Sequence, residues 1–178
     1  LGGIGLIALL VPNPSTQKAS ADTQARRKDF ARVLKNADLL RLNLGIFVLH
    51  AVLMSVFLVV PFQLQDMEIV SKDHWKVYLS VMIASIVLMV PLVVAANRGG
   101  KLKIVFVVVI ALLVLAQLVL AGAGHSFWLL ALGMVVFFTA FNVLEATLPS
   151  LISRLAPPDA KGTALGVYSS IQFLGPAI

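Results

Sequence analysis

The feature that most constrains this chain is a series of long stretches without charged residues. They occupy residues 42–64, 77–96, 104–124, 126–153 and 162–178, and Glu145 is the one charge inside them. About 20 apolar residues in a helix span the ~30 Å hydrocarbon core of a bilayer at 1.5 Å per residue. Because the backbone must satisfy its own hydrogen bonds in lipid, these stretches are predicted to be transmembrane helices.

Composition also indicates a membrane protein. Charged residues make up 12% of the chain and hydrophobic residues 60%, whereas a soluble domain usually carries about 25% charge. The remaining polar surface is too small to cover a water-soluble globule. The chain has no cysteine, which excludes disulfides and thiolate metal sites. We therefore expect an all-α polytopic bundle whose surroundings are the lipid bilayer.

The basic residues lie in alternate connecting segments. Twelve of the 14 Lys and Arg residues fall in segments 12–41, 97–103 and 154–161. Alternation of this kind follows the positive-inside rule and predicts that these three segments face the cytoplasm. Membrane topology explains the net charge of +6 better than a nucleic-acid partner does, and none is expected.

The segment before the first full span divides into parts. Residues 1–11 are predicted to be the end of a truncated transmembrane helix, and residues 12–41 a basic cytoplasmic linker. Within this linker, Phe30, Val33, Leu34 and Ala37 have helical spacing opposite a basic face. This pattern predicts an amphipathic helix that lies on the membrane surface or packs on the bundle. The transmembrane bundle is expected to occupy residues 42–178.

A turn between two predicted spans resembles a known loop motif. The segment VVAANRGGKLKIV is similar to G-x-x-x-D-R-x-G-R-[RK], a short cytoplasmic loop of the major facilitator superfamily. Arg98, Gly100 and Lys101 match this motif, whereas Asn97 replaces its acidic residue and Val93 its first glycine. These two departures weaken the case for a charge relay through the loop.

A second stretch extends this resemblance. The residues FFTAFNVLEATLPSLISRLAPPDAKGTALGVYSSIQFLGP resemble the tenth and eleventh helices of YajR-type transporters, which are bacterial inner-membrane members grouped with drug:proton antiporters. The resemblance covers the whole chain. It implies the C-terminal six-helix half of the superfamily fold, with its first and last helices truncated.

The resemblance also implies a function. Transporters of this superfamily alternate between inward-open and outward-open states and bind substrate near the bilayer midplane, between two six-helix halves. For this chain it implies proton-coupled efflux of an unknown small molecule from the bacterial inner membrane. The expected partner is the N-terminal six-helix half of the same chain, and no cofactor is expected.

Glu145 is the candidate functional residue with the clearest physical reason. An ionised carboxylate inside a membrane costs roughly 2.5–3.5 kcal/mol on insertion scales. Thr139, Asn142, Glu145 and Pro149 fall on about one face of a helix, so this stripe should turn away from lipid. Glu145 is then either a carboxylate that binds protons or substrate, or one that joins helices through a hydrogen bond together with Asn142. The sequence leaves both possibilities open.

Other polar residues in the spans are weaker candidates. His50 lies in the middle of its span, where it either titrates in the cavity or serves as a neutral hydrogen-bonding residue. Gln63 either lines the cavity or belongs to a packing face. The three histidines are far apart in sequence and have no carboxylate at metal-ligand spacing, so no metal site is expected. Gly162 and Gly166 form a G-x-x-x-G pair that predicts close helix packing.

Two other classes of membrane protein are alternatives to a transporter. A membrane-embedded enzyme needs paired carboxylates, a Ser–Lys pair or a metal site at membrane depth, and these spans contain a single carboxylate. A structural or sensory subunit without transport activity remains the alternative. A matching six-span segment upstream favours the transporter, whereas a soluble signalling domain favours the sensor.

Overall fold

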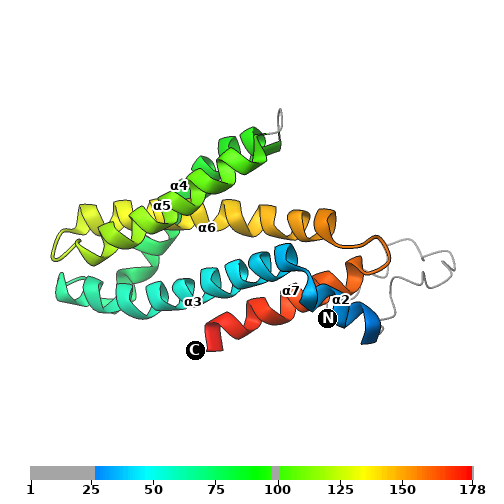
Figure 1. Cartoon of the computed structure of the whole chain (residues 1–178). Coiled ribbons are helices and arrows are strands. Elements are labelled where there is room, and N and C mark those ends of the chain that lie inside the picture. The colour runs from blue at the N-terminus through cyan, green and yellow to red at the C-terminus, as the bar shows by residue number, and fades with distance from the viewer. Residues whose placement is uncertain (1–26, 98–100, 178) are drawn as a thin grey trace, which may run out of the picture.

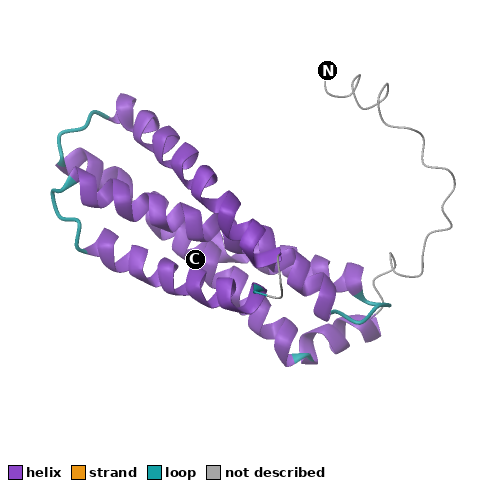
Figure 2. Ribbon diagram, turned by 90° about the horizontal axis from the view of Figure 1, so that it is seen from above, coloured by secondary structure: helices purple, strands orange, loops and turns teal. Residues whose placement is uncertain are grey.

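The structure is a computed structural model that describes residues 27–97 and 101–177, and Figure 1 shows its helices. Its elements are α2 (Arg27–Lys35), α3 (Ala37–Asp66), η2 (Ser71–Asp73), α4 (His74–Asn97), α5 (Leu102–Ala121), α6 (Phe127–Leu155), α7 (Lys161–Leu174) and η3 (Gly175–Ala177). Figure 2 shows helices joined by loops, without a strand in the described ranges. The predicted helix end at 1–11 lies outside the described residues.

Helices α3, α4, α5 and α6 are long and apolar enough to cross a membrane. Their outward side chains are apolar as well: Leu58 is 67% exposed and Val87 is 65% exposed. Such a surface suits lipid and not water, because large exposed apolar areas are rare on soluble monomers. The predicted all-α membrane bundle is therefore confirmed.

Helix α6 is the centre of the bundle. Helices α4 and α5 pack against it and against each other, while α3 and α7 pack on α6 and on one another. In Figure 1, α4 and α5 cross one side of α6, and α3 and α7 lie on the other. Twelve residues of α6 are buried, including Gly133, Phe137 and Leu144. Of the predicted polar stripe, Thr139 is buried, and Asn142, Glu145 and Pro149 are partly buried.

The buried apolar side chains form two clusters along the helices. One joins α3, α6 and α7 around residues such as Ile46, Leu144 and Tyr168. The other joins α3, α4, α5 and α6 around residues such as Val60 and Phe137. We use "the basic end" for the end of the bundle where α3 and α7 begin and α6 ends, and the first cluster lies nearer to it. Hydrogen-bonding side chains of α3, α6 and α7 lie along this first cluster.

The linker helix ends earlier than its apolar pattern predicts. Helix α2 stops at Lys35, and the Asn36 side chain caps α3 by accepting hydrogen bonds from the backbone N–H groups of Asp38 at 3.0 Å and Leu39 at 3.2 Å. Because Asn is a strong N-cap residue, α3 begins at Ala37, inside the segment predicted to be linker. Helix α3 therefore begins five residues before the predicted start of the first span at residue 42.

The predicted apolar face of α2 is divided in the structure. Val33 is buried in the first cluster, whereas Phe30 and Leu34 stay exposed. Arg32 donates to both carboxylate oxygens of Asp159, at 2.9 and 2.8 Å, and so joins α2 to the turn before α7. This hydrogen bond and the charge of Asp159 raise the pKa of Arg32 above its ordinary value. Helix α2 therefore packs on the bundle through Val33 and leaves two apolar side chains free for a membrane surface.

Candidate functional site

Glu145 of α6 joins a neighbouring helix through a hydrogen bond. Its Oε1 atom accepts from the Nε2 atom of Gln172 on α7 at 2.7 Å. Glu145 lies ten residues before the end of α6 at Leu155, or about 15 Å along the helix axis. Glu145 therefore lies well inside the predicted membrane span and not at its end.

His50 of α3 completes the cluster. Its Nε2 atom lies 3.1 Å from Gln172 Nε2 and 3.9 Å from Glu145 Oε2, and its Nδ1 atom lies 3.2 Å from the backbone oxygen of Ile46. Phe141 packs edge-on against the imidazole ring at 5.5 Å. The polar cluster of His50, Glu145 and Gln172 thus ties together three helices.

The two titratable side chains of this polar cluster are partly buried. The side chain of His50 is 11% exposed and that of Glu145 is 34% exposed. Glu145 Oε2 is itself buried and has no hydrogen-bond partner among the described residues. One carboxylate oxygen of Glu145 is therefore hydrogen-bonded, and the other is buried without a hydrogen-bond partner in the described part of the chain, which is costly for a polar atom.

A glycine beyond the end of α7 brings Gln172 into reach. A Cβ atom on Gly175 would lie 2.5 Å from the backbone oxygen of Phe47 and 3.0 Å from the Cβ atom of His50. Only glycine fits at this approach without a shift of the backbone. Gln172 lies one helical turn earlier, so the close contact at Gly175 sets the distance between its amide and His50.

The glycine pair predicted from the sequence does not make this contact. Gly162 and Gly166 are exposed, and a Cβ atom on Gly166 would meet nothing within 4 Å. The expected close packing at this pair is therefore absent within the described residues. Helix α7 approaches its neighbour most closely at Gly175, because there its end crosses directly over α3.

The rest of the predicted polar stripe points to other partners. Asn142 donates from Nδ2 to Ser85 Oγ of α4 at 3.5 Å, and Thr139 donates to the backbone oxygen of Val135 in its own helix at 2.7 Å. Neither hydrogen bond reaches Glu145. Helix α6 therefore uses Asn142 toward α4 and Glu145 toward α7.

Sequence comparison places the chain in a family. The sequence model of the Major Facilitator Superfamily matches residues 1–178. The chain belongs to this superfamily. It is 46% identical over 176 residues to the inner membrane transport protein YajR of Escherichia coli, an alignment that covers 99% of this chain and 39% of YajR.

Two further relatives come from Buchnera aphidicola and are described as uncharacterized transporters. One is 29% identical over 135 residues, covering 76% of this chain and 35% of the relative, and the other is 28% identical over 149 residues, covering 83% and 38%. The chain thus spans about two fifths of the length of these relatives or less. Membership of the superfamily points to a transporter and not to an enzyme.

The superfamily loop motif is only partly described. Asn97 ends α4, and its Nδ2 atom donates to the backbone oxygen of Val93 at 3.0 Å. Lys101 is exposed at the start of α5, while Arg98 and Gly100 lie outside the described residues. The side chain that replaces the motif's acidic residue therefore caps the end of its own helix.

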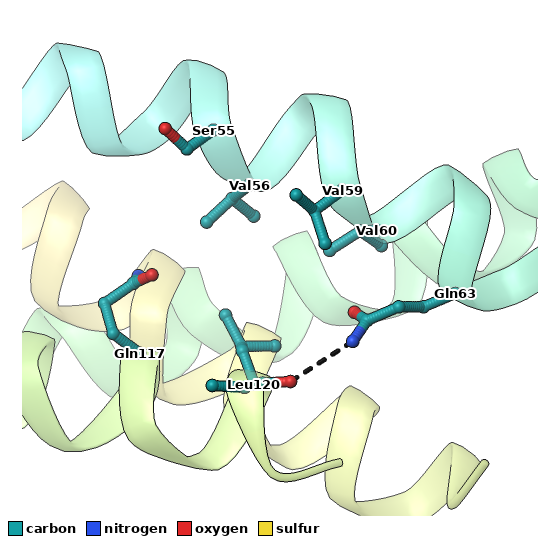
Figure 3. A pocket seen from close by; sticks show the side chains of 8 residues that line it. Ser55, Val56, Val59, Val60, Gln63, Gln117 and Leu120 are labelled. Atoms are coloured by element: carbon teal, nitrogen blue, oxygen red, sulfur yellow. Dashed lines mark hydrogen bonds between the residues drawn. The ribbon is translucent and has the colours of Figure 1, made fainter. Parts of the chain in front are cut away.

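Gln63 lies in a separate hollow far from Glu145. This hollow of about 210 Å³ lies between α3 and α5. Gln63 Nε2 donates to the backbone oxygen of Leu120 at 3.2 Å, while Gln63 Oε1 and Gln117 Nε2 are buried without partners among the described residues. Figure 3 shows the two amides reaching it from different helices. Gln63 is 13 residues beyond His50, or about 20 Å along α3.

Gln172 is the residue of the polar cluster that the sequence reasoning missed. It is one of few hydrogen-bonding side chains in the last apolar stretch, and it lies three residues before Gly175. An amide side chain close to a glycine in a predicted membrane helix could have marked Gln172 as a candidate residue. Its partners could not be inferred, because they lie 27 and 122 positions away in the sequence.

Proposed function

We propose that this chain is the C-terminal half of a secondary transporter that exports small molecules from the bacterial inner membrane in exchange for protons, by alternating access. The observation that carries the proposal is the polar cluster of His50, Glu145 and Gln172 inside three packed membrane helices. The names of the relatives, two transporters and an inner membrane transport protein, support the location and the transport activity.

The chemistry of the polar cluster suits a proton-coupled step. Intramembrane ionisable residues are costly and usually mark substrate paths or proton relays. Glu145 supplies a carboxylate with an unsatisfied buried oxygen, and His50 supplies an imidazole 3.9 Å from it. Histidine is the side chain whose charge most readily changes at physiological pH. An incoming proton can therefore bind to either of two adjacent atoms, Glu145 Oε2 or His50 Nε2.

The remaining candidates would contact the cargo. Thr139 borders an apolar hollow of about 320 Å³ beside Leu88 and Leu112, and Gln63 borders the hollow described above. Apolar linings with a few hydrogen-bonding groups suit lipophilic compounds. The N-terminal six-helix half would close the other side of the cavity, as in transporters built from two such halves.

The first test compares the full-length wild type with Glu145→Gln in inverted membrane vesicles. The substitution removes the titratable group but leaves an amide oxygen that can still accept from Gln172, so the helix contact is retained. Dissipation of an imposed pH gradient is recorded while lipophilic cations and neutral drugs are added. We expect the wild type to respond to at least one compound and the variant to respond to none.

Asp66→Asn is the matched control, because it removes one exposed carboxylate at the end of α3, outside the polar cluster. It should behave as the wild type. If Glu145→Gln and the wild type respond equally, Glu145 is a packing residue and the proton site is elsewhere. A wild type that moves no protons with any compound would contradict proton antiport and favour a structural or sensory subunit.

A further inference from the structure

The hydrogen bonds around Gln172 fit one arrangement of donors and acceptors when Glu145 is ionised. A carboxylate only accepts hydrogen bonds, so the Gln172 atom that faces Glu145 must be the amide nitrogen with its two N–H donors. The same nitrogen faces His50 Nε2, which must therefore accept. The proton of a neutral His50 is then on Nδ1, where it donates to the Ile46 oxygen. With Glu145 ionised, these contacts fit a neutral imidazole, a carboxylate and a shared amide.

A proton that enters this cluster has two positions that it can take. Glu145 Oε2 is buried and unpartnered, and His50 Nε2 lies 3.9 Å from it. A proton on either atom makes that atom a donor to the other, once the pair closes by about 1 Å to hydrogen-bond distance. The uptake of one proton changes the net charge of the cluster from −1 to 0, and no other proton is released.

After this uptake the amide of Gln172 cannot keep its hydrogen bond to His50. A proton on His50 Nε2 would face the Gln172 N–H group, donor against donor, across 3.1 Å. A proton on Glu145 Oε2 would need the lone pair of His50 Nε2, which the amide already occupies. In both cases the direct contact between His50 and Glu145 removes the hydrogen bond from Gln172 to His50, while Glu145 Oε1 can still accept from Gln172.

We infer that Gln172 is a positioning residue that acts as a proton-released latch. Without the coupling proton it ties α7 to both α3 and α6, and proton uptake exchanges its hydrogen bond to His50 for one between His50 and Glu145. Helix α7 then keeps its hydrogen bond to α6 but is no longer tied to α3 at this level, and it is free to move relative to α3. The inference rests on the proposed proton coupling and adds the element that moves.

Few other groups can produce this pH response. The titratable side chains at the level of the polar cluster are His50 on α3, Glu145 on α6 and Tyr168 one turn before Gln172 on α7, and a phenol ordinarily titrates near pH 10. The other charged side chains of these helices are nine or more residues away, which is about 13 Å; they are Asp38, Arg41, Asp66, Arg154 and Lys161. Those that the structure describes on α2, α4 and α5 lie at helix ends: Asp29, Arg32, Lys35, His74, Lys76, Lys101 and Lys103.

The test measures the protection of α7 in the full-length protein in lipid nanodiscs. Hydrogen–deuterium exchange of residues 168–177, corrected for the intrinsic effect of pH, is recorded above and below the midpoint of proton-driven transport. In the wild type we expect protection to fall at least about threefold as the pH falls through this midpoint, as in local opening. Equal protection on both sides would overturn the latch.

Three variants separate the latch from other causes. Gln172→Met keeps the length of the side chain without its hydrogen bonds, and it should show low protection at both pH values. Glu145→Gln cannot take up the proton, so its protection should be the same at both pH values. Gln117→Met makes the same chemical change in the separate hollow of α5 and should keep the wild-type response.

The outcomes distinguish this inference from the proposed function. If Gln172→Met keeps the pH-dependent protection of the wild type while Glu145→Gln abolishes proton flux, the latch is wrong and proton coupling stands. If Gln172→Met does not fold, a loss of the pH response in Glu145→Gln still supports the latch. A pH response that persists in Glu145→Gln overturns it.

Discussion

Glu145, His50 and Gln172 show how three ordinary side chains acquire a special environment inside a membrane bundle. Each could be satisfied by water on a soluble protein, where the net value of one hydrogen bond is about 1 kcal/mol. In the bundle Gln172 lies between the other two side chains, and one carboxylate oxygen of Glu145 has no partner among the described residues. The arrangement depends on the close approach at Gly175, where a hydrogen atom fits and a methyl group does not.

Gly175→Ala tests that contact at the residue scale. The added methyl group would meet the backbone oxygen of Phe47 at 2.5 Å, so the end of α7 must shift. We expect a loss of about 1–3 kcal/mol in the free energy of unfolding, as for other overpacked sites. Thermal unfolding of the full-length protein in detergent measures it.

Gly166→Ala is the control for this substitution, because its added methyl group meets nothing within 4 Å. Alanine is favoured over glycine in a helix by up to about 1 kcal/mol. This variant should therefore be as stable as the wild type or slightly more stable. Equal losses in both variants would show that the close approach at Gly175 has no special role.

At the scale of elements, the break between α2 and α3 separates the linker helix from the first span. One asparagine makes this break, since its side chain satisfies two free N–H groups of α3. Val33 and the Arg32–Asp159 ion pair then hold α2 against the turn before α7. The helix that carries Gln172 is thus attached at its start to the linker and near its end to α3.

Asn36→Ala removes the cap of α3 and should cost about 1 kcal/mol in the stability of its first turn. Hydrogen exchange of residues 37–41 in the full-length protein should become faster. Asn36→Asp, which keeps an accepting side chain, should remain close to the wild type. If the two variants exchange at the same rate, the cap does not define the start of α3.

At the scale of the whole molecule, the distribution of charge predicts orientation. The segment before α3 is basic, and Arg154 and Lys161 flank the turn between α6 and α7, whereas the turn between α3 and α4 carries charges of both signs. By the positive-inside rule the basic end of the bundle faces the cytoplasm. Protons entering from outside would then reach the polar cluster from the opposite end.

Single-cysteine labelling of the full-length protein in intact cells tests this orientation. Val70→Cys lies in the turn before α4 and Pro158→Cys in the turn before α7, and both positions are exposed and uncharged. We expect an impermeant thiol reagent to label Val70→Cys and to reach Pro158→Cys only after the membrane is opened. Labelling in the reverse order would mean that the bundle is inverted.

Some features of the candidate site were readable in the sequence. Glu145 and His50 stand out because each is polar in a stretch that must lie in lipid. That Glu145 bonds to a neighbouring helix was one of two open possibilities, and its partner Gln172 was missed. The G-x-x-x-G pair makes no close contact within the described residues, so the packing predicted for it stays a prediction, and the close approach at Gly175 was not predicted.

The amino-acid sequence alone establishes the class of this protein and the approximate position of each membrane helix. It does so because a bilayer allows only structures that satisfy their own backbone, and runs of about 20 apolar residues leave little choice. Which polar side chains meet was decided by tertiary structure. Those meetings depend on how each helix is rotated about its axis, and the rotation is set by side chains packed against it from helices distant in sequence.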